Sequence, residues 1–126
     1  MKQTFKILLL LLSISLINCK KDNKDVLPPD ITTLEVTEIT TTTAVSGGEV
    51  DVYYDELAMG LIINTSQNPT FENYTGSFLP GTIGQKRFSS EMRNLVPNTK
   101  YYVRAYVMRN GDVKYGNQVE FTTLAE

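Results

Sequence analysis

Few residues in this sequence of 126 are suited to covalent chemistry. It contains one cysteine, Cys19, and no histidine. A histidine-based catalytic triad is therefore excluded, and nucleophilic catalysis would need a Ser-Lys or threonine arrangement, for which we find no motif. The carboxylates of Asp51, Asp55 and Glu56 are close in sequence and could suit a glycosidase or calcium, but a calcium loop has denser Asp, Asn and Gly spacing. We expect no enzymatic activity and no cofactor.

The neighbours of Cys19 indicate what its thiol is for. Lys2 and Lys6 precede an apolar stretch, residues 7–17. About eleven residues are too few to span a bilayer as a helix, so a signal segment is favoured over a transmembrane helix. A lone cysteine cannot close a disulfide within its own chain, which leaves attachment as its predicted role.

This arrangement resembles a bacterial lipoprotein signal, with residues 16–18 as the lipobox before Cys19. The resemblance implies that residues 1–18 are removed and that Cys19 carries a diacylglycerol and further acyl chains such as palmitate, which together make a stable membrane anchor. Lys20 stands where an aspartate would favour the inner membrane, so the resemblance implies the outer membrane, with surface exposure left open. The alternative is an ordinary secretory signal with an incidental cysteine.

Two regions follow the signal segment. Residues 19–30 comprise the predicted lipidated cysteine and a tether, "KKDNKDVLPPD", whose charges and proline pair disfavour packing. Residues 31–126 form the predicted domain, because short alternating apolar runs are separated there by turn residues and no helical pattern is present. We predict strands over residues 32–39, 42–51, 57–64, 74–79, 86–94, 99–108 and 113–123.

The segment "LVPNTKYYVRAYV", residues 95–107, carries a second resemblance. Its alternating positions resemble the corner and following strand of fibronectin type III domains. The resemblance implies a seven-stranded antiparallel β-sandwich of the fibronectin type III and immunoglobulin-like class, in which strand 86–94 pairs with 42–51 and strand 99–108 pairs with 57–64. Tyr101 would be the structural tyrosine-corner residue, and the alternative is a plain core aromatic. The matching positions are Leu95, Pro97, Thr99, Tyr101, Val103 and Ala105.

Alternation along residues 42–51 predicts which face is buried. One register would bury Glu49 without a partner, which is costly, so the opposite register is expected inside. That face has small side chains, and we expect strands 57–64 and 99–108 to supply the bulk opposite it. The pair Asn110-Gly111 predicts a two-residue type I′ hairpin. The residues expected inside are Ala44, Ser46, Gly48 and Val50.

Aromatic residues in predicted loops are the candidate ligand-binding residues. Aromatic rings beside carboxylates and amides are used in sugar and protein recognition. The alternative is that these rings cover the open edges of the sandwich. The candidates are Tyr53, Tyr54, Phe71, Tyr74 and Phe78.

Ten basic and fourteen acidic residues follow Cys19. This balance disfavours nucleic acid as a partner. The sequence therefore predicts a non-enzymatic, lipid-anchored module of the cell envelope that serves in binding, adhesion or assembly with a protein or glycan. A purely structural spacer or packing subunit of an envelope complex is the alternative. Antiparallel topology would place the tether beside loops 51–57 and 109–112.

Overall fold

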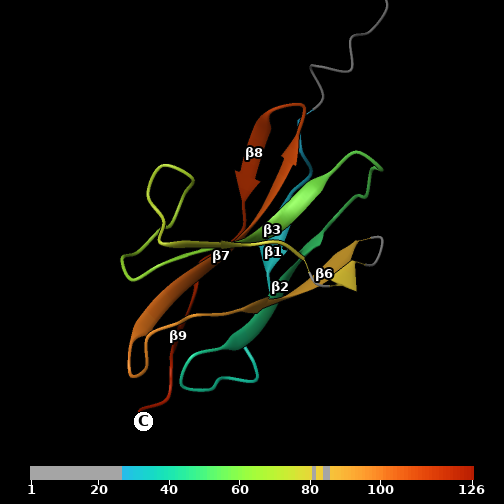
Figure 1. The fold of residues 1–126 in the computed structure, drawn as a ribbon. Helices are drawn as coiled ribbons and strands as arrows, with labels where there is room; N and C mark the ends of the chain where they lie inside the picture. The colour runs from blue at the N-terminus through green and yellow to red at the C-terminus, as the bar shows by residue number, and fades with distance from the viewer. Residues whose placement is uncertain (1–26, 81, 84–85) are drawn as a thin grey trace, which may run out of the picture.

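Two antiparallel β-sheets face each other in the described part of the chain (Figure 1). The structure is a computed structural model and describes residues 27–80, 82–83 and 86–126. The predictions for the signal segment 1–18, for Cys19 and for the tether up to residue 26 lie outside these residues. Within the described ranges, no helix has the length and apolar character needed to cross a membrane.

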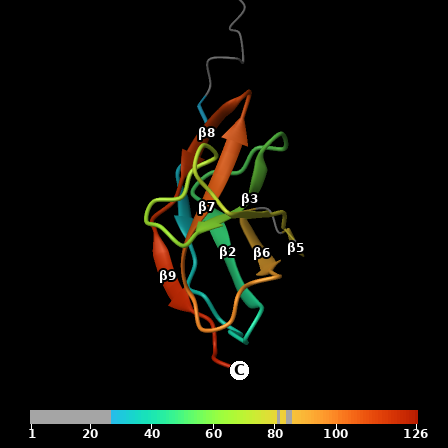
Figure 2. The same ribbon diagram turned by 60° about the vertical axis from the view of Figure 1, so that its left-hand side comes forward.

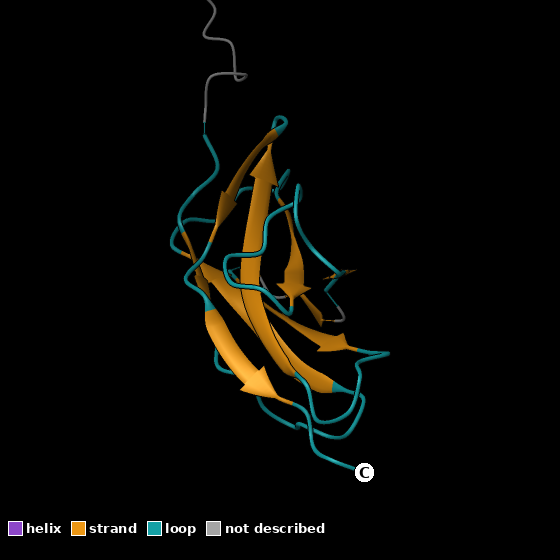
Figure 3. Cartoon of the chain, turned by 90° about the vertical axis from the view of Figure 1, so that its left-hand side faces the viewer, coloured by secondary structure: helices purple, strands orange, loops and turns teal. Residues whose placement is uncertain are grey.

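The sheets have the strand orders β1-β2-β6-β5 and β4-β3-β7-β8, and β9 also pairs with β7. Every pairing is antiparallel, so the predicted all-β sandwich is confirmed (Figure 3). Seven strands were predicted, and the described ranges contain nine. Their bounds are β1 Ile31–Thr33, β2 Ala44–Val50, β3 Ala58–Asn64, β4 Gly76–Phe78, β5 Thr82–Ile83, β6 Arg87–Met92, β7 Lys100–Arg109, β8 Asp112–Tyr115 and β9 Val119–Thr122.

The predicted partners and buried faces of the long strands are confirmed. Strand β2 pairs with β6, and β3 pairs with β7. Glu49 is exposed, and the opposite face of β2 is buried. This is the predicted register, because an inward carboxylate without a partner would be costly. The inward residues of β3 and β7 belong to the same core cluster: Met59, Leu61, Ile63, Tyr101, Val103, Ala105 and Val107.

Part of the bulk next to the small residues of β2 comes from β6, its neighbour in the same sheet. Gly48 is the register partner of Phe88 on β6, in the same sheet. A Cβ at Gly48 would lie 2.7 Å from Cε1 of Phe88 and 2.8 Å from Cβ of Ala105, so the phenyl ring occupies the space that the glycine leaves. An aromatic ring that covers a neighbouring glycine is a recognised way to stabilise a sheet. Phe88 thus adds, from within the same sheet, to the bulk that β3 and β7 supply from the opposite sheet.

One predicted strand, 113–123, is split into β8 and β9 by a bulge. Between these strands, residues 116–118 stand opposite only Arg104 and Ala105 of β7. The N–H of Ala105 donates instead to Oγ1 of Thr33 on β1, at 2.8 Å. The N–H of Thr33 donates in turn to Oδ1 of Asn117, also at 2.8 Å. Because β1 takes over one backbone hydrogen bond of β7, three residues of the outer strand stand opposite two of β7, which is a bulge. The same bond joins the two sheets at this edge.

The described chain begins at the same end as the β7–β8 hairpin, and the C-terminus lies at the other end (Figure 1). Asn110 and Gly111 have φ angles of 53° and 88° between the paired residues Arg109 and Asp112, so the predicted two-residue hairpin is present. Asp30 accepts a hydrogen bond from Asp51 and forms an ion pair with Lys114. The start of the domain therefore lies beside the β2–β3 loop and the hairpin, as the antiparallel topology predicted.

The proline pair before β1 belongs to the packed domain. Pro28 and Pro29 are buried, although the predicted tether extended to residue 30. Proline has no backbone N–H to leave unsatisfied, so burying it costs little hydrogen bonding. Packing thus starts before the boundary predicted at Ile31.

Candidate functional site

The β2–β3 loop, residues 51–57, is held in place by a buried arginine from β7. The guanidinium of Arg109 lies 3.9 Å from the ring centroid of Tyr54. Its Nη2 donates to Oε1 of Glu56 at 2.8 Å, and only 8% of the Arg109 side chain is exposed. A cation over an aromatic ring is attracted by the ring's negative face, most strongly when water is excluded. Tyr54 is therefore a packing residue that orders the loop.

Arg109 also carries an unfavourable feature. Its Nε and Nη1 are buried and have no hydrogen-bond partner among the described residues. An unsatisfied buried donor costs about 1–3 kcal/mol, so the ion pair with Glu56 and the contact with Tyr54 must offset that cost. The loop is thus positioned by an interaction that is expensive in stability.

The same interaction predicts a pH dependence. The hydrogen bond from Arg109 lowers the pKa of Glu56 below its ordinary value of 4.5. A carboxylate whose pKa is lower in the folded state stabilises that state above its unfolded pKa, and the contribution is lost as pH falls through the folded value. The denaturation midpoint of the wild-type protein should therefore fall between pH 7 and pH 3, and we expect Glu56→Gln to make this fall smaller. Glu72→Gln, which changes an exposed carboxylate without an ion pair in the described ranges, should leave that fall unchanged; equal effects would contradict the prediction.

A cavity of about 460 Å³ lies beside this loop. We call it the loop-end hollow. Tyr53, the neighbour of the fixed Tyr54, is half-buried and lines it together with Asp55. Leu79 forms another part of its wall and is 76% exposed. The complete lining is Tyr53, Asp55, Leu57, Ala58, Met59, Leu79 and Pro80.

The carboxylates of the loop have different partners. Glu56 pairs with Arg109, and Oδ1 of Asp51 accepts the backbone N–H of Asp30. Asp55 is exposed and makes no hydrogen bond or ion pair with a described residue. In the described part of the chain, no three acidic, cysteine or histidine residues are grouped so that they could hold a metal ion. Asp55 is thus the loop carboxylate left available to a ligand.

Phe71 and Tyr74 lie on a different face from the loop-end hollow. The loop between β3 and β4 crosses the outer face of β7 (Figure 2), where the Phe71 ring centroid is 4.7 Å from that of Tyr106 and 6.1 Å from that of Tyr115. The N–H of Phe71 donates to the Tyr115 hydroxyl. Burial raises the pKa of Tyr106. Phe71 therefore packs over the sheet, and Tyr74, which is 46% exposed, lies beside it with ring centroids 6.0 Å apart.

Phe78 and Tyr101 have packing positions. Phe78 lies on the edge strand β4 and packs against the core cluster. Tyr101 is buried, and its hydroxyl accepts the backbone N–H of Val96 at 2.9 Å. This bond to backbone a few residues upstream is the geometry of a tyrosine corner. The five candidate aromatic residues thus do not form one site: Tyr53 lines the loop-end hollow, and Phe78 borders a separate space of about 410 Å³ beside β4. Phe71 and Tyr74 contact each other over the outer face of β7.

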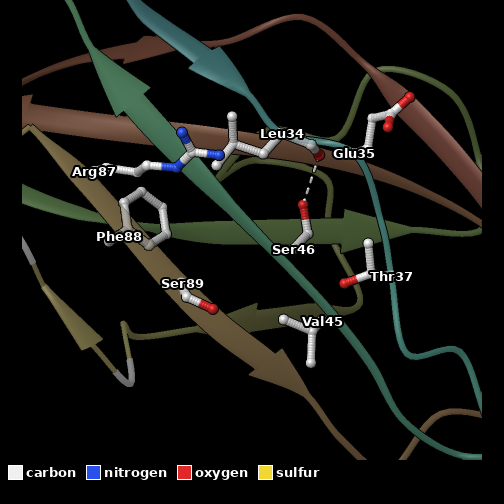
Figure 4. A pocket seen from close by; sticks show the side chains of 8 residues that line it. All are labelled: Leu34, Glu35, Thr37, Val45, Ser46, Arg87, Phe88 and Ser89. Carbon is white, nitrogen blue, oxygen red and sulfur yellow. Dashed lines mark hydrogen bonds between the residues drawn. The ribbon is translucent and has the colours of Figure 1, made fainter.

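A second depression, which the sequence did not predict, crosses the outer face of the β1-β2-β6-β5 sheet (Figure 4). We call this space of about 590 Å³ the sheet groove. Gly47 of β2 leaves the surface without a side chain here, and a Cβ at this position would lie 2.0 Å from the carbonyl oxygen of Phe88. The adjacent glycines at positions 47 and 48 were the feature of the sequence that could have predicted this groove. The lining residues are Leu34, Glu35, Thr37, Val45, Ser46, Arg87, Phe88 and Ser89.

Comparisons with known proteins establish the fold class. No protein-family model and no curated protein matches the sequence. The sensor domain of the anti-sigma factor RsgI4 from Pseudobacteroides cellulosolvens is similar in structure, with a TM-score of 0.57 and 21% identity over 77% of this chain and 76% of that one. A second structure of that sensor domain, of a shorter chain, gives a TM-score of 0.55 and 22% identity over 81% of this chain and 100% of that one.

A redesigned β-sandwich protein gives a similar result, with a TM-score of 0.53 and 26% identity. The match covers 78% of this chain and 94% of that one. These similarities place the domain among small β-sandwich proteins.

Proposed function

We propose that this protein is a non-enzymatic binding or sensing module of the cell envelope, anchored through lipid on Cys19 and related to fibronectin type III domains. The similarity to β-sandwich structures, which include a sensor domain, supports a module that recognises a partner. The lipoprotein-like signal supports the anchor and the outer-membrane location. The proposed recognition role and the proposed lipid anchor rely on different residues, so each requires its own test.

The observation that carries the proposed recognition role is the ordered β2–β3 loop. Arg109 fixes Tyr54 and Glu56, and the same loop places Tyr53 and the unpaired Asp55 at the loop-end hollow. A binding surface that is ordered before it meets its partner loses less entropy on association. The partner is a protein or a glycan that meets this end of the sandwich.

The position of the first described residues suggests where that partner is located. With Pro28 packed, the proposed tether consists of residues 20–27, which span at most about 29 Å when fully extended. The tether joins the sandwich at the end that carries the loop-end hollow. The proposed site is thus held within about one domain length of the membrane, and a partner in or near the membrane is within its reach.

The anchor is tested by the intact mass of the protein purified from its natural host. We expect a mature chain that begins at Cys19 and carries two or three acyl chains, and we expect Cys19→Ser to abolish acylation and membrane retention. An unacylated Cys19 in the wild-type protein would contradict the proposed anchor. The proposed binding role is tested separately, by a pull-down from native envelopes followed by mass spectrometry.

A structural spacer or packing subunit is the second candidate, and the open sheet groove favours it. A neighbouring subunit seated on the β1-β2-β6-β5 face would cover Leu34 and Val45. Glu35→Arg should then disrupt assembly and leave the loop-end hollow unchanged. Tyr53→Leu should instead affect recognition at the hollow, so the two variants distinguish the two functions. A glycan array distinguishes a glycan from a protein partner.

A further inference from the structure

We infer that the loop-end hollow receives a lysine or arginine side chain of a protein partner. This inference rests on the binding role proposed above and specifies the chemistry of that site. It comes from the combination of an unpaired carboxylate, an aromatic residue and an apolar wall in one cavity of about 460 Å³.

The charge of the lining favours a cationic occupant. Among the described residues that line the hollow, Asp55 is the one that carries a charge. Of the described basic residues at this end, Arg109 and Lys114 are engaged in ion pairs with Glu56 and Asp30, and Lys86 and Arg87 beside the end of β2 form no ion pair with Asp55. The negative charge of Asp55 is thus not neutralised by a described residue, and an incoming ammonium or guanidinium group would complement it.

The remaining lining suits the rest of a basic side chain. Lysine and arginine carry an apolar stem of three or four methylene groups that packs on apolar surfaces while the charged head stays at a polar rim. Leu57, Met59 and Pro80 offer such a surface, and Tyr53 offers an aromatic ring, which attracts cations through its face. An anionic partner would meet Asp55 with repulsion, and a neutral sugar would offer it hydroxyl hydrogen bonds but no ion pair, which is the stronger interaction.

The sheet groove provides an internal contrast. Glu35 and Arg87 both line it, and Figure 4 shows the side chains of Arg87 and Leu34 directed toward each other across β2. Its lining therefore carries both signs of charge and does not select a cation. A carboxylate at Glu35 is also exposed and has no ion pair with a described residue, which makes Glu35→Gln a matched control for Asp55→Asn.

The test is fluorescence anisotropy with labelled tetralysine, tetraarginine and tetraglutamate peptides, added to the full-length protein purified from envelopes in detergent. We expect the two basic peptides to bind, with affinity that falls as salt is raised, and the acidic peptide not to bind. Asp55→Asn should weaken binding by about tenfold, the factor that corresponds to the loss of one charge-assisted contact. Tyr53→Leu should weaken it by about threefold to tenfold. Glu35→Gln should change it by less than about twofold.

Each other outcome overturns the inference. These outcomes are no binding of the basic peptides, equal binding of the acidic peptide, and equal losses for Asp55→Asn and Glu35→Gln. Circular dichroism and the denaturation midpoint show whether each variant retains the fold; Asp55→Glu, which keeps the charge, should retain most of the affinity. If the envelope pull-down succeeds but its capture does not depend on Asp55, the binding role stands and the inferred ligand chemistry is wrong.

Discussion

Replacing Phe88 by alanine is expected to lower the free energy of unfolding by about 3–5 kcal/mol, the cost of deleting a buried phenyl ring. Phe88 is 2% exposed and belongs to the core cluster. Its ring also fills the space beside Gly48, so truncation would open a cavity between the sheets. Because domains of this size are stable by roughly 5–15 kcal/mol, the variant would lose a large share of its stability. Chemical denaturation monitored by circular dichroism measures the effect.

A double-mutant cycle with Gly48 distinguishes this explanation from a general loss of packing. Gly48→Ala alone is expected to destabilise the fold, because the new Cβ would lie 2.7 Å from the ring of Phe88. In a Phe88→Leu background that cost should fall by at least about 0.5 kcal/mol, the threshold for coupling between residues in contact. Leu124→Ala, which removes an exposed side chain, is the control and should have little effect. Additive effects of the two core changes would show that the ring does not occupy the space beside Gly48.

Thr33→Val is expected to cost about 1–3 kcal/mol, because it leaves the buried N–H of Ala105 without an acceptor. Valine has nearly the same shape as threonine, so the loss reports the hydroxyl and not the volume. The bond from the backbone N–H of Thr33 to Asn117 would remain, although the joint between the sheets would be weakened. Hydrogen exchange at the amide of Ala105 should accelerate together with the loss of stability.

Thr32 provides the matched control for Thr33. It lies on the same strand with an exposed side chain, and Thr32→Val should change stability by less than about 0.5 kcal/mol. If the two substitutions had equal effects, a change in β-strand propensity, and not the loss of the bond to Ala105, would explain them. Asn117→Ala should cost less than Thr33→Val, because Asn117 is exposed and its bond to the N–H of Thr33 is only partly buried, so that water can replace the amide.

The sequence predicted well those features that depend on near neighbours. Alternation placed Gly48 and Glu49 on the correct faces, since residues in a strand point to opposite sides with a period of two. Asn110 and Gly111 determined a two-residue hairpin because both tolerate positive φ. The pairing of β2 with β6 and of β3 with β7 followed from the resemblance to a known sandwich topology.

The candidate site was less accessible to prediction from sequence. Aromatic loop residues were grouped because rings are common at binding surfaces, and that criterion does not separate Tyr53 from Tyr54. The two residues are distinguished by Arg109, which is 53 residues from Glu56 in sequence. Arg109 covers the ring of Tyr54, whereas Tyr53 lines the loop-end hollow. Phe71 was separated from the site in the same way, by its contact with Tyr106 on the outer face of a sheet.

The sequence by itself determined the long strand-forming segments β2, β3, β6 and β7, the inward faces and the hairpin, because these depend on the local preferences of the backbone and on alternation. It did not determine the short strand β5, the limits of β1, or the break between β8 and β9. The tertiary structure alone decided that Thr33 bonds to Ala105, 72 residues away, that Arg109 orders the β2–β3 loop, and that Phe88 fills the space of Gly48. Alternation specifies which side of a sheet a side chain occupies. It carries no information on which distant side chain lies opposite, because that is set by how two twisted sheets stack.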